Sequence, residues 1–388
     1  MLLSDIKILD LTQLLPGPFC SKLLSDFGAE VIKIERPGIG DLARFFTPKK
    51  GSDAASFHHL NMSKKSLTLD LKSDEGRKIF LDLVKDCDVL LESSRPGTME
   101  KMGIGYNKIR RVNPKIIYCS ISAYGQTGPY REKAAHDLNI IGLSGILEMT
   151  GEYSRPPAIP GVQIADISSG LYACIAILLA LMERKRKGVG QKIDISMLDS
   201  TISFLSIHAA DFFASGELPQ RGKGILTGGF ACYNIYKTKD KRYMTLVGLE
   251  PHLWKEACLA LGFESWITKQ FDPHFQETMK EELRKLFSQR TMNEWINFLG
   301  RKNVCCEPVL NIQETFLHPQ VIHTKIKSQV RYPKLGTIEG IDVPIKFSNI
   351  RTKKQRPAPL LGEYTCQALK KLGYKACAIQ SLRDKKVI

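Results

Sequence analysis

The feature that most constrains the fold is the alternation of strand and helix patterns over the first 125 residues. Strand patterns cover residues 6–11, 30–35, 66–71, 87–93 and 115–125. Helical patterns lie between them, as in KSDEGRKIFLDLVKD, which Ser73 or Asp74 is suited to cap. Strands that alternate with helices form βαβ units with right-handed crossovers. We therefore predict an α/β fold with a parallel, doubly wound sheet.

The second half of the chain has a different order of strand and helix patterns. Residues 170–184 form an apolar helical pattern that ends in basic residues, and residues 192–200 resume a strand pattern. In residues 220–248 apolar and polar residues alternate as in a β-hairpin, with Lys-Asp-Lys at the expected tip. Helical patterns follow over 252–300. The last helical pattern is GEYTCQALKKLG. These signals predict a second, smaller α+β domain.

Composition narrows the class of function. The formal net charge of +16 over 388 residues favours an anionic partner, such as nucleic acid, an acidic membrane surface or a polyphosphate. The turn after the first strand, TQLLPGPFC, lacks G-x-G-x-x-G, which argues against a nicotinamide enzyme. Ten cysteines without a C-x-x-C pair favour neither a zinc site nor a thioredoxin motif.

Targeting signals are not apparent in the sequence. The start MLLSDIKILDL lacks a basic region and a cleavage site, and the ending DKKVI is unlike S-K-L. The apolar run 170–182 is shorter than a bilayer span. We therefore expect a cytoplasmic protein with reduced thiols and without membrane association.

Three acid–base residues stand at predicted helix starts. His136 precedes Asp137, the expected N-cap of LNIIGLSGILEMTG, and Asp166 stands where a loop enters the long apolar helix. Glu250 precedes Pro251, a residue suited to the first helical position. Each residue alone is also explained as a capping or surface residue. If the three helix starts converge, their N–H groups would stabilise an oxyanion while the side chains exchange protons.

At these residues the chain resembles the family III CoA-transferase superfamily, and within it the α-methylacyl-CoA racemase branch. The resemblance covers nearly the whole chain. It runs through PGPFCSKLLSDFGAEVIKIERP, SLTLDLKSDEG, ESSRPGTMEKMGIGY, SAYGQTGPY, AAHDLN, IADISSG, GKGILTGG, VGLEPHLW and LGEYTCQALKKLGY. Two positions depart from the family pattern: Met62 stands where an arginine is common, and Ile140 where racemases usually have tyrosine.

The resemblance implies roles for the site residues. Asp166 would be the nucleophile of a transferase or one of two bases of a racemase. His136 would be the second base, Glu250 would support it, and Asp137 and Asn139 would position the thioester beside an oxyanion site. All three acid–base residues together favour a racemase or epimerase of 2-methyl-branched acyl-CoA thioesters. A CoA-transferase and a basic nucleic-acid-binding protein remain the alternatives.

The resemblance also implies how the ligand and the chain are organised. Coenzyme A would enter as part of the substrate, without a metal or other cofactor, and we expect no nucleic-acid partner. The implied CoA-binding residues are Arg36, Lys64, Lys65, Arg95, Lys101 and Tyr106. The implied fold is an interlocked homodimer with a Rossmann-like large domain, a linker and a small domain. These parts would cover residues 1–190 with 325–388, residues 191–224 and residues 225–324.

Overall fold

A computed structural model describes residues 1–333, 335–350, 352 and 354–388. Within it the chain forms two compact units. The first holds residues 1–144, 162–204 and 322–388, and the second holds residues 145–161 and 205–321. The domain boundaries expected from the sequence stay a prediction.

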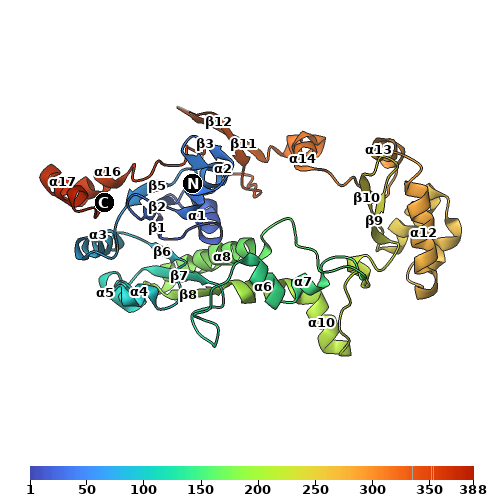
Figure 1. Cartoon of the computed structure of the whole chain (residues 1–388), viewed down its shortest axis with the longest axis horizontal. Helices are drawn as coiled ribbons and strands as arrows, with labels where there is room; N and C mark the ends of the chain where they lie inside the picture. Colours follow the sequence, from blue (N-terminus) through green and yellow to red (C-terminus); the bar gives the residue numbers. More distant parts are fainter. Residues whose placement is uncertain (334, 351, 353) are drawn as a thin grey trace. The chain divides into compact units, whose positions relative to one another are not determined.

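A six-stranded sheet forms the centre of the first unit (Figure 1). Its strands are β1 (Lys7–Asp10), β2 (Glu30–Glu35), β5 (Lys65–Thr68), β6 (Val89–Glu92), β7 (Ile117–Ser122) and β8 (Lys192–Ser196). All neighbours pair in parallel, in the order β5-β2-β1-β6-β7-β8. Counted within this sheet alone, the order is 3-2-1-4-5-6, the arrangement of a Rossmann fold. The predicted α/β class with a parallel sheet is confirmed.

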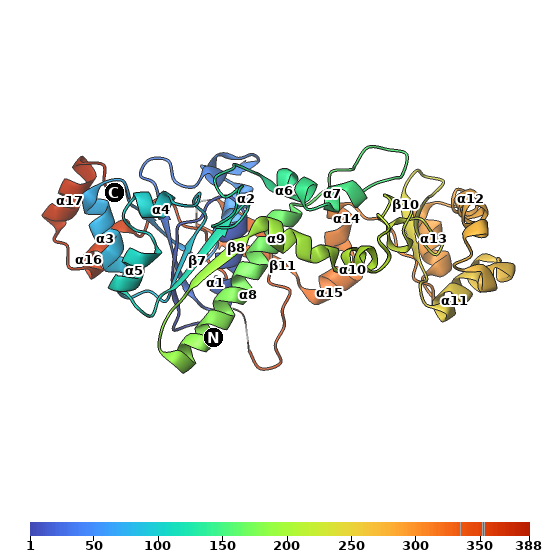
Figure 2. The same cartoon turned by 90° about the horizontal axis from the view of Figure 1, so that it is seen from below.

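Helices cover both faces of this sheet (Figures 1 and 2). On one face, α1 (Pro16–Asp26) contacts β1, β2 and β6, and α8 (Ile164–Lys187) contacts β7 and β8. On the other face, α3 (Asp74–Val84), α5 (Tyr106–Val112) and α16 (Thr365–Lys371) contribute to one apolar core with the strands. Burial on both faces explains why the strands read as nearly continuous apolar runs.

The remaining elements of the first unit lie outside this sheet and its main helices, and one of them, η2, ends in the second unit. They are η1 (Leu42–Phe45), β3 (Lys49–Lys50), β4 (Asp53–Ala54), α2 (Ala55–Asn61), α4 (Thr98–Lys101), α6 (Asp137–Leu143), α9 (Met197–Ile202), η2 (Ser203–Leu205), β11 (Lys327–Tyr332), β12 (Gly336–Ile341) and α17 (Ala376–Asp384). As predicted, Ser73 caps α3, and its Oγ accepts from the N–H of Gly76 at 3.0 Å.

The second unit has its own core. The hairpin β9 (Tyr233–Lys237) and β10 (Tyr243–Val247) confirms the predicted hairpin, and its tip holds Lys-Asp-Lys. Trp254 and Trp295 are buried among the helices that follow. The other elements, the last of which extends across the boundary between the units, are α7 (Ile146–Met149), α10 (Ser206–Ser215), η3 (Ile225–Thr227), α11 (Pro251–Leu261), η4 (Glu264–Lys269), η5 (Pro273–Phe275), α12 (Gln276–Phe287), α13 (Met292–Leu299), α14 (Ile312–Leu317) and α15 (Pro319–Thr324).

Several element boundaries differ from the sequence-based expectation, and for two of them the local cause is clear. The strand predicted over 192–200 ends at Ser196, because the Oγ of Ser196 accepts from the N–H of Asp199 at 3.1 Å and starts α9. The N-cap of α6 is His136 and not Asp137, so the helix begins one residue earlier. The side chain of Asp137 is thereby free to bond elsewhere.

Helix α8 is longer than the apolar run read from the sequence. By length and composition it is the one helix among the described residues that is able to cross a membrane, and 44% of its most apolar window is buried within the structure. The buried side packs closely on α1: a Cβ built on Gly170 would lie 2.6 Å from the carbonyl oxygen of Pro16. The two helix backbones are therefore in direct contact.

This contact predicts the effect of Gly170→Ala. In an unobstructed helix the change stabilises by about 1 kcal/mol. Here the added methyl group overlaps a backbone atom, so we expect the free energy of unfolding to fall by about 1–3 kcal/mol in urea titrations. Gly161→Ala is the control, because nothing lies within 4 Å of a Cβ at that position. A stabilised Gly170→Ala variant would contradict the close approach.

Candidate active site

The carboxyl edge of the sheet collects several of the predicted site residues of the first unit, among them Arg36, Arg95 and His136. Strand order reverses between β1 and β6, because the next strands along the chain, β2 and β7, lie on their outer sides. Open parallel sheets bind ligands outside the carboxyl ends of their strands at such a point. The loops after β1, β2, β6 and β7 all leave from this edge, and α8, which returns to the amino end of β8, begins there.

His136 lies on the segment that follows β7. As the N-cap of α6 it has an extended backbone, and its N–H donates to Oδ1 of Asn139 at 3.0 Å. The side chain of His136 is exposed. The predicted partner Asn139 therefore fixes the backbone of the histidine, while the imidazole stays open to a ligand.

Asp137 ties the starts of two helices together. Its Oδ1 accepts from the N–H of Ala165 at 2.7 Å and from the N–H of Asp166 at 3.2 Å. The first turn of α8 is thus capped by a side chain of α6. The sequence-based reading missed this role. An acid in the first turn of a helix is a common pattern, so only the tertiary contact identifies it.

Asp166 occupies the third position of α8 and is half-buried. Burial raises the pKa of its carboxyl group to about 6; the charge of Asp137 adds to the rise and His136 opposes it. The structure therefore brings His136, Asp137 and Asp166 together, within range of electrostatic interaction. A carboxyl group that titrates near neutral pH is suited to both giving and taking a proton.

Glu250 is the N-cap of α11, with Pro251 at the first helical position, as the sequence predicted. Its side chain is exposed and belongs to the second unit. Its support of His136 stays a prediction.

The predicted CoA-binding residues fall into two groups. Arg36 after β2, Arg95 after β6 and Lys101 at the end of α4 are exposed cations. Lys65 and Tyr106 are engaged within the protein: Lys65 pairs with Glu30, and the ring of Tyr106 packs edge-on against Tyr118 at 5.6 Å. Arg36 and Arg95 lie at the carboxyl edge and are placed to meet an anion there.

Lys64 does not fit the phosphate contact that the resemblance implies. Its ammonium group is buried and donates to Oδ2 of Asp10, Oγ of Ser21, Oδ1 of Asn61 and the carbonyl of Pro18, at 2.8–3.2 Å. Burial lowers the pKa of Lys64 to about 8, although Asp10 opposes this. With its donors occupied inside the core, Lys64 supports the end of β1 instead of facing a ligand.

Asp10 is the centre of this buried network. Thr12 and Ser21 donate to it, and although burial opposes ionisation, Lys64 and Lys33 lower its pKa to about 2. The carboxylate is therefore charged and fully paired. An aspartate at the end of a strand gives no sequence signal of such a network.

The two departures from the family pattern are both buried. Met62 packs with Val330, Tyr332 and Ile338, so an arginine at that position would have to bury its guanidinium. Ile140 is fully buried in α6. Both side chains therefore pack in the core of this chain.

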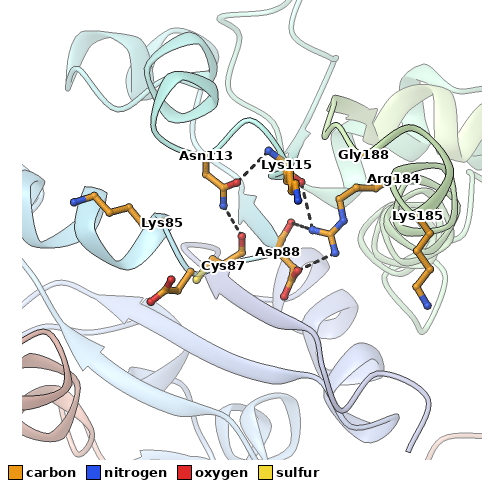
Figure 3. A pocket seen from close by; sticks show the side chains of 9 residues that line it. Lys85, Cys87, Asp88, Asn113, Lys115, Arg184, Lys185 and Gly188 are labelled. Atoms are coloured by element: carbon orange, nitrogen blue, oxygen red, sulfur yellow. Dashed lines mark hydrogen bonds and ion pairs between the residues drawn. The ribbon is translucent and has the colours of Figure 1, made fainter.

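A cavity of about 510 Å³ lies at the opposite, amino edge of the sheet (Figure 3). Several of its polar groups lie at the C-termini of helices. Arg184 in the last turn of α8 binds the carboxylate of Asp88 at 2.8 Å and donates to the carbonyl of Lys115, and Asn113 donates to the carbonyl of Cys87. Asn113 also donates to the carbonyl of Val84, the last residue of α3. Cations at helix C-termini offset the negative end of the dipole, which accounts for this lining.

The hydrogen bonds that Asp137 accepts from the start of α8 predict different outcomes for two substitutions. Asp137→Ala removes the acceptor, and we expect the free energy of unfolding to fall by about 1 kcal/mol.

Asp137→Asn keeps an acceptor oxygen but removes the charge that raises the pKa of Asp166, so Asp166 should titrate below pH 6. NMR of the carboxyl carbons measures the titration. An unchanged pKa in Asp137→Asn would contradict the proximity of the two carboxylates.

Comparisons with known proteins agree with this architecture. The profile described as CoA-transferase family III matches residues 3–365. The chain is 35% identical to succinyl-CoA:glutarate CoA-transferase from Homo sapiens, over 100% of this chain and 90% of that protein. It is 31% identical to alpha-methylacyl-CoA racemase from Homo sapiens, over 100% of this chain and 98% of that protein.

A solved structure extends the likeness to the fold. The crystal structure of a CAIB/BAIF family protein from Brucella suis superposes with a TM-score of 0.82 at 30% identity, and covers 95% of this chain and 98% of that one. The predicted resemblance is confirmed over nearly the full length. The chain belongs to CoA-transferase family III.

Proposed function

We propose that the protein is a racemase or epimerase of 2-methyl-branched acyl-CoA thioesters. The observation that carries the proposal is the bond from Asp137 to the start of α8, which keeps His136 and Asp166 at one edge of the sheet. Likeness to alpha-methylacyl-CoA racemase along the full chain supports it.

The reaction needs a base and an acid on opposite sides of the α-carbon. The imidazole of His136 removes the α-proton from one face, and the negative charge moves to the thioester oxygen. Backbone N–H groups at the start of α6 stabilise that enolate. Protonated Asp166 then delivers a proton to the other face. In the reverse direction the two residues exchange roles, and a pKa near 6 lets Asp166 serve in both.

The second candidate is a CoA-transferase. Likeness to succinyl-CoA:glutarate CoA-transferase favours it, as does a half-buried carboxylate at a helix start. Asp166 would attack the thioester carbonyl, form a mixed anhydride and release the CoA thiolate. This chemistry does not require proton abstraction by His136, which separates the two candidates.

Isotope exchange tests the first proposal. One enantiomer of a 2-methylacyl-CoA is incubated with the enzyme in D2O, and deuterium and configuration at the α-carbon are followed by NMR and chiral chromatography. We expect deuterium uptake with loss of configuration, and a rate about 10²–10⁴-fold lower in His136→Ala. His274→Ala, which changes an exposed histidine of η5, serves as the matched control.

The same assay detects the alternative. Transfer of CoA to an added carboxylic acid, without deuterium uptake and with full activity in His136→Ala, would contradict the racemase proposal and support the transferase.

We further propose that the active form is a homodimer in which α8 contacts a second copy of the chain. Leu171, Ile175, Leu178, Leu179 and Met182 are exposed and follow one another at helical spacing. The stripe begins near Asp166, so a partner seated on it would adjoin the site. Apolar stripes of this kind mark contact surfaces.

Leu179→Lys tests this contact. A charge in the middle of the stripe should convert the dimer to a monomer in analytical ultracentrifugation and lower activity at equal concentration. Ile341→Lys, at an exposed position of β12, is the control. A monomeric wild-type protein that is retained on lipid vesicles would contradict the proposal and favour a membrane as the partner of α8.

A further inference from the structure

The loop between β1 and α1 contains a backbone conformation that leucine rarely adopts. Leu14 has φ of 66°, in the left-handed region, where the Cβ of an L-residue crowds its own backbone. The loop leaves the carboxyl edge at the point where strand order reverses. Strained residues at such a place persist only where the surrounding structure holds them.

One buried ion pair holds this loop on two sides. Oδ1 of Asp41 accepts from the N–H of Leu14 at 3.1 Å, and Oδ2 pairs with the ammonium of Lys33 at 2.8 Å. The same ammonium donates to the carbonyl of Thr12 at 2.7 Å. Both charged side chains are almost fully buried, so water does not compete for these bonds.

The same carboxylate organises the neighbouring loop. Oδ1 of Asp41 also accepts from the N–H of Ala43, and the N–H of Asp41 donates to Glu35 at the end of β2. The segment between Glu35 and Asp41 carries Arg36, one of the exposed cations at this edge. Asp41 therefore fixes the loop after β1 and the loop after β2 relative to each other.

The side chain of Leu14 explains why a glycine is not needed here. It packs against a small apolar cluster formed by Ala43, Ala54, Phe57 and Ala358. The side chain of Leu14 is thus held against this cluster while its backbone keeps the left-handed conformation.

We propose that Asp41 is a positioning residue for acyl-CoA: it holds Leu14 in the left-handed conformation and so keeps the loop after β1 in the shape that accepts the ligand. The inference rests on the proposed binding of acyl-CoA at this edge, but not on which reaction follows. Asp41 acts through Leu14 and does not touch the substrate itself.

The expected effect follows from the population of the left-handed conformation. Without the ion pair, leucine would occupy this conformation about a tenth of the time or less, so the apparent Kd would rise about tenfold. Glycine occupies it about as readily as the right-handed region. In a Leu14→Gly background, loss of Asp41 should therefore raise Kd only about twofold.

The experiment measures the Kd of free coenzyme A by calorimetry, together with KM and kcat for an acyl-CoA. Asp41→Ala should raise Kd and KM about tenfold and leave kcat nearly unchanged. Adding Leu14→Gly should restore most of the affinity. Leu14→Ala is the matched control: it removes the same packing but keeps a Cβ, so it should not restore binding.

Asp41→Leu serves where Asp41→Ala fails to fold, because it keeps the volume and removes both acceptor oxygens; its Kd should be relieved by Leu14→Gly in the same way. Unchanged CoA affinity in a folded Asp41→Ala or Asp41→Leu variant would overturn the inference, as would equal rescue by glycine and alanine. A wild-type protein that does not bind coenzyme A would instead overturn the proposed function.

Discussion

The candidate site depends on the carboxylate of Asp137, which begins one helix and caps another. By accepting from the N–H groups of Ala165 and Asp166, it joins α6 to α8 and thereby fixes the spacing between His136 and Asp166. The same negative charge adds to the rise in the pKa of Asp166. The carboxylate that fixes the geometry of this site thus also adds to the effect that burial has on the pKa of Asp166.

The parallel sheet explains why residues so far apart in the chain meet. Its crossovers return each loop to the carboxyl edge, which gathers the segments of Asp10, Arg36, Arg95 and His136. The amino edge receives the C-terminal ends of the helices, and there Arg184 of α8 binds the carboxylate of Asp88 and the carbonyl oxygen of Lys115. The two edges therefore differ in chemistry, although both carry many basic residues.

Much of the fold was predictable from the sequence because strands buried on both faces leave short runs of apolar residues, as in VLL of β6. The end of β8 was not, since a serine that caps a helix and a serine within a strand look alike. The phosphate contact expected of Lys64 came from the resemblance. The burial of its ammonium group was not readable from the sequence, because most of its partners come from distant segments. His136 and Asp166 were found as residue types at helix starts. The bond between their helices, and the ion pair of Asp41 with Lys33, depend on tertiary packing.

The contact between Gly170 and Pro16 has a consequence for motion. Helices that touch backbone to backbone move together, because no side chain lies between them to change rotamer. Since α1 and α8 both start at the carboxyl edge, we expect the loop after β1 and the start of α8 with Asp166 to keep their positions relative to each other. If a ligand enters at this edge, we expect the motion that it needs to occur in other segments, such as the long loop between β7 and α6.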